Sequence, residues 1–192
     1  MQVVDFIEAL KGQSEFLSVS LAATLGITEY TAESSMLTPE ILSAANRSVL
    51  CWLATADESG QPNVSPKEIF AIFDSEYLVI ANIASPSSAR NIEANSCVCV
   101  SFIDVFVQKG FKVVGTASNV RKQDNTFALW VAPLKAKTAS RYPIHSVFVV
   151  HATSVEPILA PSYRLYQAET TEESQIQSAL RVYGVHSMPR DA

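Results

Sequence analysis

Short apolar runs separated by turn residues fill the chain between residues 48 and 120, and this pattern restricts the fold more than any other feature. Between the runs lie segments such as 57–62 and 74–76, which hold the Gly, Pro, Asp and Ser residues typical of tight reversals. The spacing predicts consecutive antiparallel strands, and the first is apolar on both faces, as a fully buried strand is. The predicted strands span residues 49–56, 64–73, 77–83, 97–106, 111–121 and 147–158.

Helix signals flank these strands. Thr38 is a predicted N-cap, and Ser87 or Ser88 is expected to cap a second, short helix. Near the C-terminus, Thr170 with an acid three residues later forms a predicted capping box, and Gly184 is a natural helix stop. The predicted helices span residues 39–46, 88–95, 125–137 and 171–183. The whole pattern predicts a mainly β fold, a small closed or nearly closed barrel with helices as lids.

Residues 1–35 stand apart from this β-rich part of the chain. Four apolar residues recur there at helical spacing, namely Val3, Phe6, Ile7 and Leu10. We therefore predict an N-terminal helical arm over residues 1–35, without chemistry of its own, and one domain over residues 36–192. A chain of 192 residues suits a single core, which buries roughly 70% of the unfolded surface at this size.

The charge balance excludes several classes of partner. The net charge is −5 and Lys and Arg do not cluster, whereas nucleic-acid binding needs clustered cations. No apolar run approaches the roughly 20 residues that span a bilayer. Asp5 and Glu8 lie where a secretory signal is cationic, so we expect a cytoplasmic protein. The low charged fraction of 17% also indicates that some surface is buried against another subunit.

Cysteine and histidine patterns do not predict a metal site. Cys51, Cys97 and Cys99 each lie inside an apolar run, so we interpret them as buried small hydrophobic residues. His145 and His151 would face the same side of a strand, but no further ligands follow at the spacing of a zinc site. We expect no metal, and we interpret both histidines as core or edge residues.

The polar interruptions of the apolar pattern predict an anion site. Lys67 lies in an otherwise apolar strand, where its charge needs either solvent or an anion. Ser85, Ser87 and Ser88 precede or open a helix, whose first turn offers free backbone N–H groups and a positive dipole end. Arg90 and Asn91 follow one turn later and can add donors. Alone, Lys67 is better interpreted as an exposed strand lysine and each serine as a cap, but together they indicate a site for a phosphate-bearing ligand.

Three segments carry a resemblance to a known family. They are Leu50–Lys67, with its Asn63-Val64-Ser65-Pro66-Lys67 end, then Ser85–Asn95, and Lys109–Ala117 with the sequence Lys-Gly-Phe-Lys-Val-Val-Gly-Thr-Ala. In these segments the chain resembles the pyridoxamine 5′-phosphate oxidase-related, FMN-binding split-barrel family. The resemblance covers about residues 37–122, with a looser match at 155–163.

This resemblance implies a six-stranded antiparallel split β-barrel that forms a homodimer, with one FMN in each of two clefts at the interface. It places Ser65, Pro66 and Lys67 beside the isoalloxazine ring and the ribityl-phosphate chain. The phosphate end would be held by Asn82, Ser85, Ser87 and Ser88, with Asn91 adding a donor. Lys109 and Lys112 would reach the cofactor of the partner subunit. The expected function is that of an FMN-dependent oxidoreductase of unknown substrate.

The chain departs from the authentic oxidase of pyridoxamine phosphate. The substrate-phosphate helix of that enzyme needs a tyrosine and an arginine, but residues 126–132 read Thr-Phe-Ala-Leu-Trp-Val-Ala. The basic C-terminal motif for its substrate has no counterpart either. Oxidation of vitamin B6 is therefore not the expected activity.

Other interpretations stay open at this stage. A flavin-binding protein without turnover is one, because no general acid or base is evident beside the flavin. A reductase that uses the deazaflavin F420 is another, and haem binding through His145 or His151 is a more distant one. Trp52 and Trp130 could stack on a ring, but we interpret both as core aromatics. The sequence has no P-loop, no G-x-S-x-G elbow and no dinucleotide-binding fingerprint.

Overall fold

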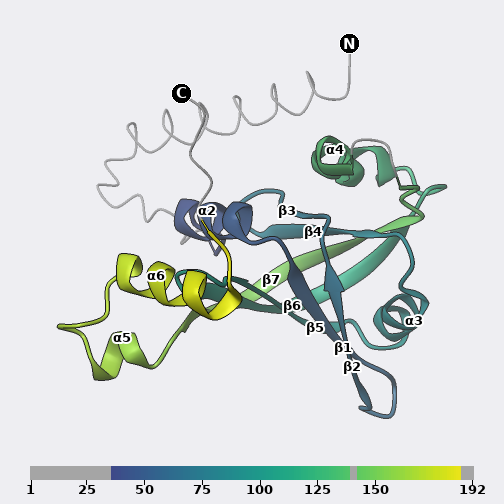
Figure 1. The fold of residues 1–192 in the computed structure, drawn as a ribbon. Helices are drawn as coiled ribbons and strands as arrows, with labels where there is room; N and C mark the ends of the chain where they lie inside the picture. The colour runs from purple at the N-terminus through teal and green to yellow at the C-terminus, as the bar shows by residue number, and fades with distance from the viewer. Residues whose placement is uncertain (1–35, 139–141, 187–192) are drawn as a thin grey trace, which may run out of the picture. The chain divides into compact units, whose positions relative to one another are not determined.

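A single antiparallel sheet organises the described part of the chain, with strands in the order β2-β1-β5-β6-β7-β4-β3 (Figure 1). The computed structural model describes residues 36–138 and 142–186, so the predicted arm over residues 1–35 lies outside the described residues. The strands are β1 Cys51–Ala56, β2 Pro62–Lys67, β3 Phe70–Ile72, β4 Tyr77–Asn82, β5 Cys97–Asp104, β6 Lys109–Arg121 and β7 Ser146–Leu159. The helices are α2 Pro39–Arg47, α3 Pro86–Ala94, α4 Phe127–Thr138, α5 Ser162–Leu165 and α6 Glu172–Tyr183.

The link between β2 and β3 shows that this sheet curls into a barrel. The two strands lie at opposite edges of the sheet, yet only Glu68 and Ile69 separate them in the chain. So short a link requires the two edges to approach each other, which is the geometry of a split barrel. The predicted fold is therefore confirmed, with seven strands instead of six. The predicted single strand over residues 64–73 is two strands, because the chain leaves one edge of the sheet after Lys67 and joins the other edge at Phe70.

The sequence predicted that the first strand is buried on both faces, but the structure shows burial on one face only. Burial alternates along β1, and Trp52 is 43% exposed between the buried Cys51 and Leu53. Only the inward face of β1 meets the core, so the apolar residues on its outward face remain open to solvent. The interpretation of Trp52 as a core residue was wrong for this reason.

Two apolar clusters hold the helices to the sheet. The first fills the barrel interior and includes Leu53, Phe102 and Phe148, with α2 packed against it. The second lies between the sheet and α4, where Leu134 packs with Val147. Trp130 is partly buried against this second cluster, and its ring lies at centroid distances of 4.7 and 5.3 Å from those of Phe73 and Tyr77. The interpretation of Trp130 as a core aromatic therefore holds in part.

Local signals set the helix ends, with small shifts from the predicted ones. The capping box of α6 uses Thr171 and Ser174 instead of Thr170 and Glu173, because Thr171 is the residue with extended backbone before the first turn. Gly184 ends α6 in the left-handed conformation, with φ of 63°, as predicted. Thr38 precedes α2, but its side chain makes no capping bond.

No helix in the described ranges is long and apolar enough to cross a membrane.

Candidate functional site

Polar side chains line the inward face of β2, whereas the inward residues of the other strands are mostly apolar. Asn63, Ser65 and Lys67 alternate along the strand and therefore share this face. The pairing register sets Lys67 opposite Cys51 and Asn63 opposite Thr55 on β1. Lys67 is only 6% exposed, so the interpretation of this residue as an exposed strand lysine does not hold.

The start of α3 closes over Lys67. Ser85 is the residue before the first turn and Pro86 opens the helix, as its fixed φ favours. The predicted caps, Ser87 and Ser88, lie two and three residues too late, because the helix already begins at Pro86 and Ser85 is the residue before it. Ser85 does not cap the helix with its side chain. Its hydroxyl instead accepts a hydrogen bond from Lys67 Nζ at 2.6 Å, and Ser65 Oγ accepts a second at 2.7 Å.

The charge of Lys67 is not neutralised within the described residues. None of the ion pairs in residues 36–138 and 142–186 includes Lys67. Burial lowers the pKa of Lys67 below its usual 10.5. Burial also raises the pKa of the facing Cys51 thiol to about 12, so that thiol is neutral and provides no counter-charge. A buried ammonium held only by hydroxyls is costly without an anion, and the site is therefore suited to bind one.

Asn82 fixes the approach to α3. Its side-chain oxygen accepts the backbone N–H of Ser85 at 3.1 Å, and its amide donates to Ser146 Oγ on β7 at 2.9 Å. Asn82 is 8% exposed, so it positions Ser85 from behind. The backbone N–H groups of Ser87 and Ser88 belong to the first turn, where no earlier helical carbonyl can accept them.

A second group of hydrogen bonds joins β1, β2 and α3. Ser65 and Ser88 share a hydrogen bond of 3.0 Å, and the Asn63 amide approaches Ser88 Oγ at 3.4 Å. Thr55 Oγ1 accepts from the amides of both Asn63 and Asn91, each at 3.1 Å. We call Thr55, Asn63, Ser88 and Asn91 the Thr55 junction. It ties the first two turns of α3 to the inward face of the sheet.

Two cavities flank the first turn of α3. The first, of about 270 Å³, is the Lys67 cavity. Its lining residues are Pro66, Lys67, Glu68, Ile69, Ala81, Ile83, Ala84, Ser85 and Tyr142. The second, of about 430 Å³, is the Arg90 cavity. It is lined by Asp57, Glu58, Gln61, Pro62, Asn63, Ser87, Arg90, Asn91 and Ala94. Arg90 is exposed there and donates to Ser87 Oγ at 3.3 Å.

The structure divides the ten predicted site residues into three groups. Those at the Lys67 cavity or directly behind it are Ser65, Pro66, Lys67, Asn82 and Ser85. Ser87 and Asn91 line the Arg90 cavity, and Ser88, which is 1% exposed, lies between the two.

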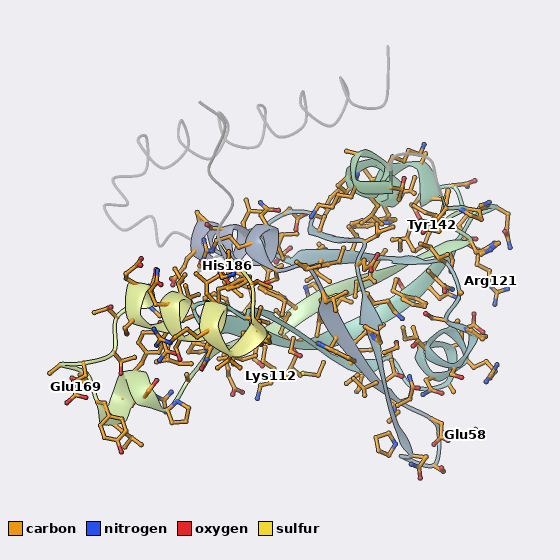
Figure 2. The ribbon with its side chains drawn as sticks, viewed as in Figure 1. Glu58, Lys112, Arg121, Tyr142, Glu169 and His186 are labelled. Carbon is orange, nitrogen blue, oxygen red and sulfur yellow. The ribbon has the colours of Figure 1, made fainter. Side chains whose placement is uncertain are left out.

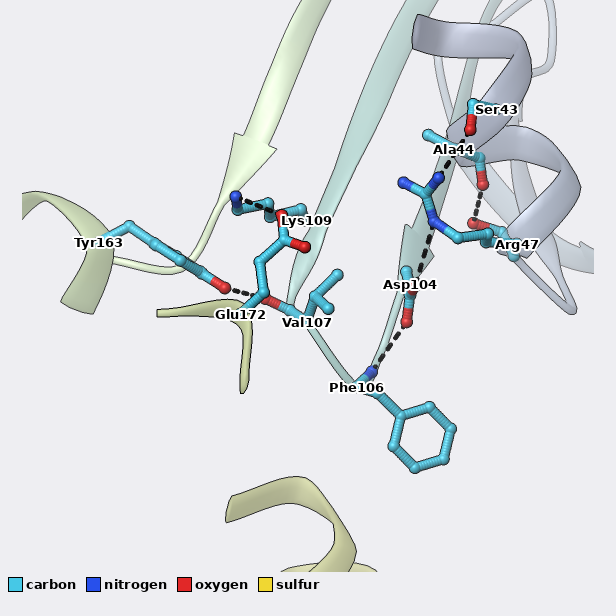
Figure 3. Close-up of polar contacts among 10 residues, drawn as sticks. Ser43, Ala44, Arg47, Asp104, Phe106, Val107, Lys109, Tyr163 and Glu172 are labelled. Carbon is cyan, nitrogen blue, oxygen red and sulfur yellow. Dashed lines mark hydrogen bonds and ion pairs between the residues drawn. The ribbon is translucent and has the colours of Figure 1, made fainter. Parts of the chain in front are cut away.

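Lys109 and Lys112 form the third group, and each is already paired. Lys109 Nζ lies 2.7 Å from Glu172 Oε1 and 4.5 Å from the ring centroid of Tyr163 (Figure 3). Lys112 Nζ lies 2.8 Å from Glu156 Oε2. Figure 2 shows Lys112 at the α6 end of the molecule, whereas Tyr142 of the Lys67 cavity lies at the α4 end. Contact of either lysine with a partner subunit's cofactor stays a prediction.

Sequence reasoning did not select every residue that shapes the site. Thr55 and Asn63 join the network, and the alternation Asn63, Ser65, Lys67 was the signal that could have placed Asn63 on the same face. Ser146 and Tyr142 come from distant parts of the chain, and only the folded sheet brings them to the site.

The described residues hold no group of three or more His, Cys, Asp and Glu side chains that could bind a metal. The interpretation of the cysteines as buried holds for Cys51 alone. Cys97 is exposed and Cys99 is partly exposed, because both lie on the outward face of β5.

Comparison with known families now gives the class of protein. The sequence profile described as pyridoxamine 5′-phosphate oxidase matches residues 37–174, well over half of the chain. The chain therefore belongs to the pyridoxamine 5′-phosphate oxidase-related family of split-barrel proteins. No curated protein matches the chain.

Solved structures with the same fold agree with this assignment. HupZ of Group A Streptococcus has 25% sequence identity and a TM-score of 0.54, over 62% of this chain and 92% of that one. An FMN-binding protein from Syntrophomonas wolfei has 13% identity and a TM-score of 0.53, over 81% and 98% of the two chains. At these identities the likeness supports the fold and does not extend to the ligand.

Proposed function

We propose that this chain is an FMN-binding flavoprotein with oxidoreductase activity, acting as a homodimer on a substrate that is not vitamin B6. Membership of its family supports the binding of a flavin, and the Lys67 cavity supports the binding of a ligand with an anionic group. The observation that carries the proposal is the buried ammonium of Lys67, held by Ser65 and Ser85 without a carboxylate partner in the described residues.

The residues present fit the phosphate of FMN. A phosphate monoester brings close to two negative charges, and Lys67, the Ser85 hydroxyl and the first turn of α3 offer donors of matching charge. In this account Lys67 and Ser85 bind the phosphate, and Asn82 holds Ser85 in place. Ile69, Ala81 and Ile83 form apolar walls that suit a flat, apolar ring. When bound, FMN supplies hydride transfer, which no side chain of the protein can perform.

A second copy of the chain is the proposed partner. The Lys67 cavity, at about 270 Å³, is smaller than the 300–1,000 Å³ usual for small-molecule sites, so the rest of a flavin needs further walls. The outward face of the sheet offers a surface on which a second copy can pack and supply these walls. Val64, Ala54, Cys99 and Val114 are successive register partners across four strands and form one apolar row. Val64 is 59% exposed, which is costly unless another surface covers it.

Visible absorption spectroscopy of the full chain tests the proposal. FMN is added to the purified protein, and NADPH follows under anaerobic conditions. A flavin band that sharpens on binding and then bleaches supports a redox-active flavoprotein. A bound band that does not bleach with NADPH or NADH supports a flavin carrier, and no binding of FMN contradicts the proposal. Sedimentation of the same samples contradicts the homodimer if the holoprotein is monomeric.

A further inference from the structure

The Thr55 junction lies behind the Lys67 cavity and does not line it. Thr55 and Ser88 are buried, at 4% and 1% exposed, and neither is among the residues that line that cavity. Thr55 nevertheless accepts two hydrogen bonds, one from a β2 side chain and one from an α3 side chain. A single buried hydroxyl therefore joins the two elements that meet at Lys67.

The connection from Thr55 to Lys67 runs through side chains of known geometry. Asn63, held by Thr55, approaches Ser88, and Ser88 shares a hydrogen bond with Ser65. Ser65 accepts from Lys67, and Lys67 donates in turn to Ser85 at the start of α3. Lys67 carries only donors, so Ser65 accepts from it, while either hydroxyl can donate in the bond between Ser65 and Ser88. Ser65 therefore links the ammonium to the Thr55 junction.

We propose that Thr55 is a positioning residue of the anion site, which fixes the distance between the first turn of α3 and β2 and so places Lys67 and Ser85 for the ligand phosphate. This inference rests on the proposed function, because it takes the phosphate of FMN as the anion. It also gives Ser88 a role through Ser65 instead of direct contact with the cofactor. The effect on binding is expected to concern the phosphate and not the flavin ring.

The Thr55→Val variant separates positioning from general damage. Valine matches threonine in shape but leaves the amides of Asn63 and Asn91 without their acceptor. We expect the affinity for FMN to fall about five- to tenfold, whereas the affinity for riboflavin, which lacks the phosphate, changes less than twofold. Thr55→Ser keeps the hydroxyl and should keep the wild-type preference for FMN. Ser88→Ala should show the same selective loss, which covers the case in which Thr55→Val does not fold.

Two results would overturn the inference. One is an unchanged FMN affinity in Thr55→Val and Ser88→Ala, and the other is an equal loss for FMN and riboflavin, which indicates a structural role only. If the wild-type protein does not prefer FMN to riboflavin, the proposed phosphate site itself fails.

A flavin-free measurement then still tests the junction. Acetylation of Lys67, followed by mass spectrometry with Lys109 as internal reference, should be several-fold faster in Thr55→Val than in wild type. An unchanged rate would contradict the positioning role independently of any flavin.

Discussion

Lys67 and Lys109 present the same side chain in opposite settings. Lys67 is buried, faces a cavity and is held by two serine hydroxyls. Lys109 is partly exposed, pairs with Glu172 and lies over the ring of Tyr163. Burial lowers the pKa of Lys67, whereas the hydrogen bond to Glu172 raises the pKa of Lys109. The first lysine has a charge that still needs an anion, and the second already has one.

Burial and the presence of a carboxylate partner distinguish a lysine that binds a ligand from one that stabilises the fold. Both residues belong to segments that resemble FMN-binding relatives, so the resemblance assigned both of them to a cofactor, Lys109 to that of the partner subunit. In the fold, Lys109 joins α5 and α6 to the β5–β6 turn, together with the bond from Tyr163 to the carbonyl oxygen of Val107 at 2.9 Å (Figure 3). Lys67, by contrast, donates to Ser65 and Ser85 at the site.

The largest expected effect comes from replacing each lysine by methionine. Lys67→Met should lower the affinity for FMN about 10- to 100-fold, because a charge-assisted contact contributes roughly 1.5–3 kcal/mol and each 1.4 kcal/mol is tenfold. Lys109→Met is the matched control and should change the affinity less than about threefold by the same conversion. Calorimetric titration with FMN checks both variants.

The opposite result would contradict the distinction between Lys67 as a ligand-binding lysine and Lys109 as a structural one. A large loss in Lys109→Met would place that lysine at the cofactor after all, as the family resemblance implies. Mixing the two variants would then restore some binding if one cleft uses Lys67 of one subunit and Lys109 of the other.

The pH dependence of FMN binding also distinguishes Lys67 from Lys109. The pKa of Lys67 is lowered in the folded protein, so its ammonium begins to lose its proton at a pH below 10.5. The affinity for FMN should therefore fall as the pH rises toward 10.5. Lys109, with a raised pKa, stays charged there. Titration from about pH 8 upward keeps the phosphate almost fully ionised, because its second pKa is about 6.

The stability of the flavin-free protein should change in the opposite sense. Because the unfolded chain binds the Lys67 proton more tightly, the cost of burying the charge is present below the folded pKa. It disappears as the pH approaches 10.5, so this group makes the protein more stable as the pH rises. Chemical denaturation of wild type and Lys67→Met across this range tests the sign, since the contribution should be absent from the variant.

The serines at the start of α3 distinguish the two cavities. Ser85→Ala removes one acceptor from Lys67 and should weaken FMN binding about three- to tenfold. Ser87→Ala is a control from the same turn. Ser87 accepts a hydrogen bond from the exposed Arg90 and not from Lys67, so this substitution should change binding less than about twofold. If Ser87→Ala has the larger effect, the phosphate lies in the Arg90 cavity.

The smallest effect is expected at the structural lysine. Glu172→Gln removes the charge that pairs with Lys109, but both side chains are partly exposed, at 37% and 59%. Such ion pairs contribute roughly 0–1 kcal/mol, so the free energy of unfolding should fall by less than about 1 kcal/mol. Urea denaturation measures it, and a loss of several kcal/mol would show that α6 is far more important to the fold than its contacts indicate.

The fold was predictable because its signals are local. Apolar runs and turn residues indicated the strands and the barrel, and the seventh strand was missed only because β2 and β3 are joined by Glu68 and Ile69 without a turn signal. Trp52 was misplaced for a different reason. Which face of a strand meets the core depends on the sheet around it, and a strand that is apolar on both faces does not reveal that.

The site was predictable only in part. Lys67, Ser85 and the start of α3 stood out because polar groups interrupt an apolar pattern. The pairing of Lys109 with Glu172 joins residues 63 positions apart, and the bond of Asn82 to Ser146 joins residues 64 positions apart. Such contacts follow from the sheet order and leave no trace in local spacing.

A crystal structure of the full chain with FMN would test most directly whether Lys67 binds the phosphate of FMN. We predict a phosphate oxygen at about 2.7–2.9 Å from Lys67 Nζ, the usual length of a charge-assisted bond, with Lys109 still paired with Glu172. A flavin whose phosphate lies away from Lys67, with Lys67 still bound only to Ser65 and Ser85, would contradict it.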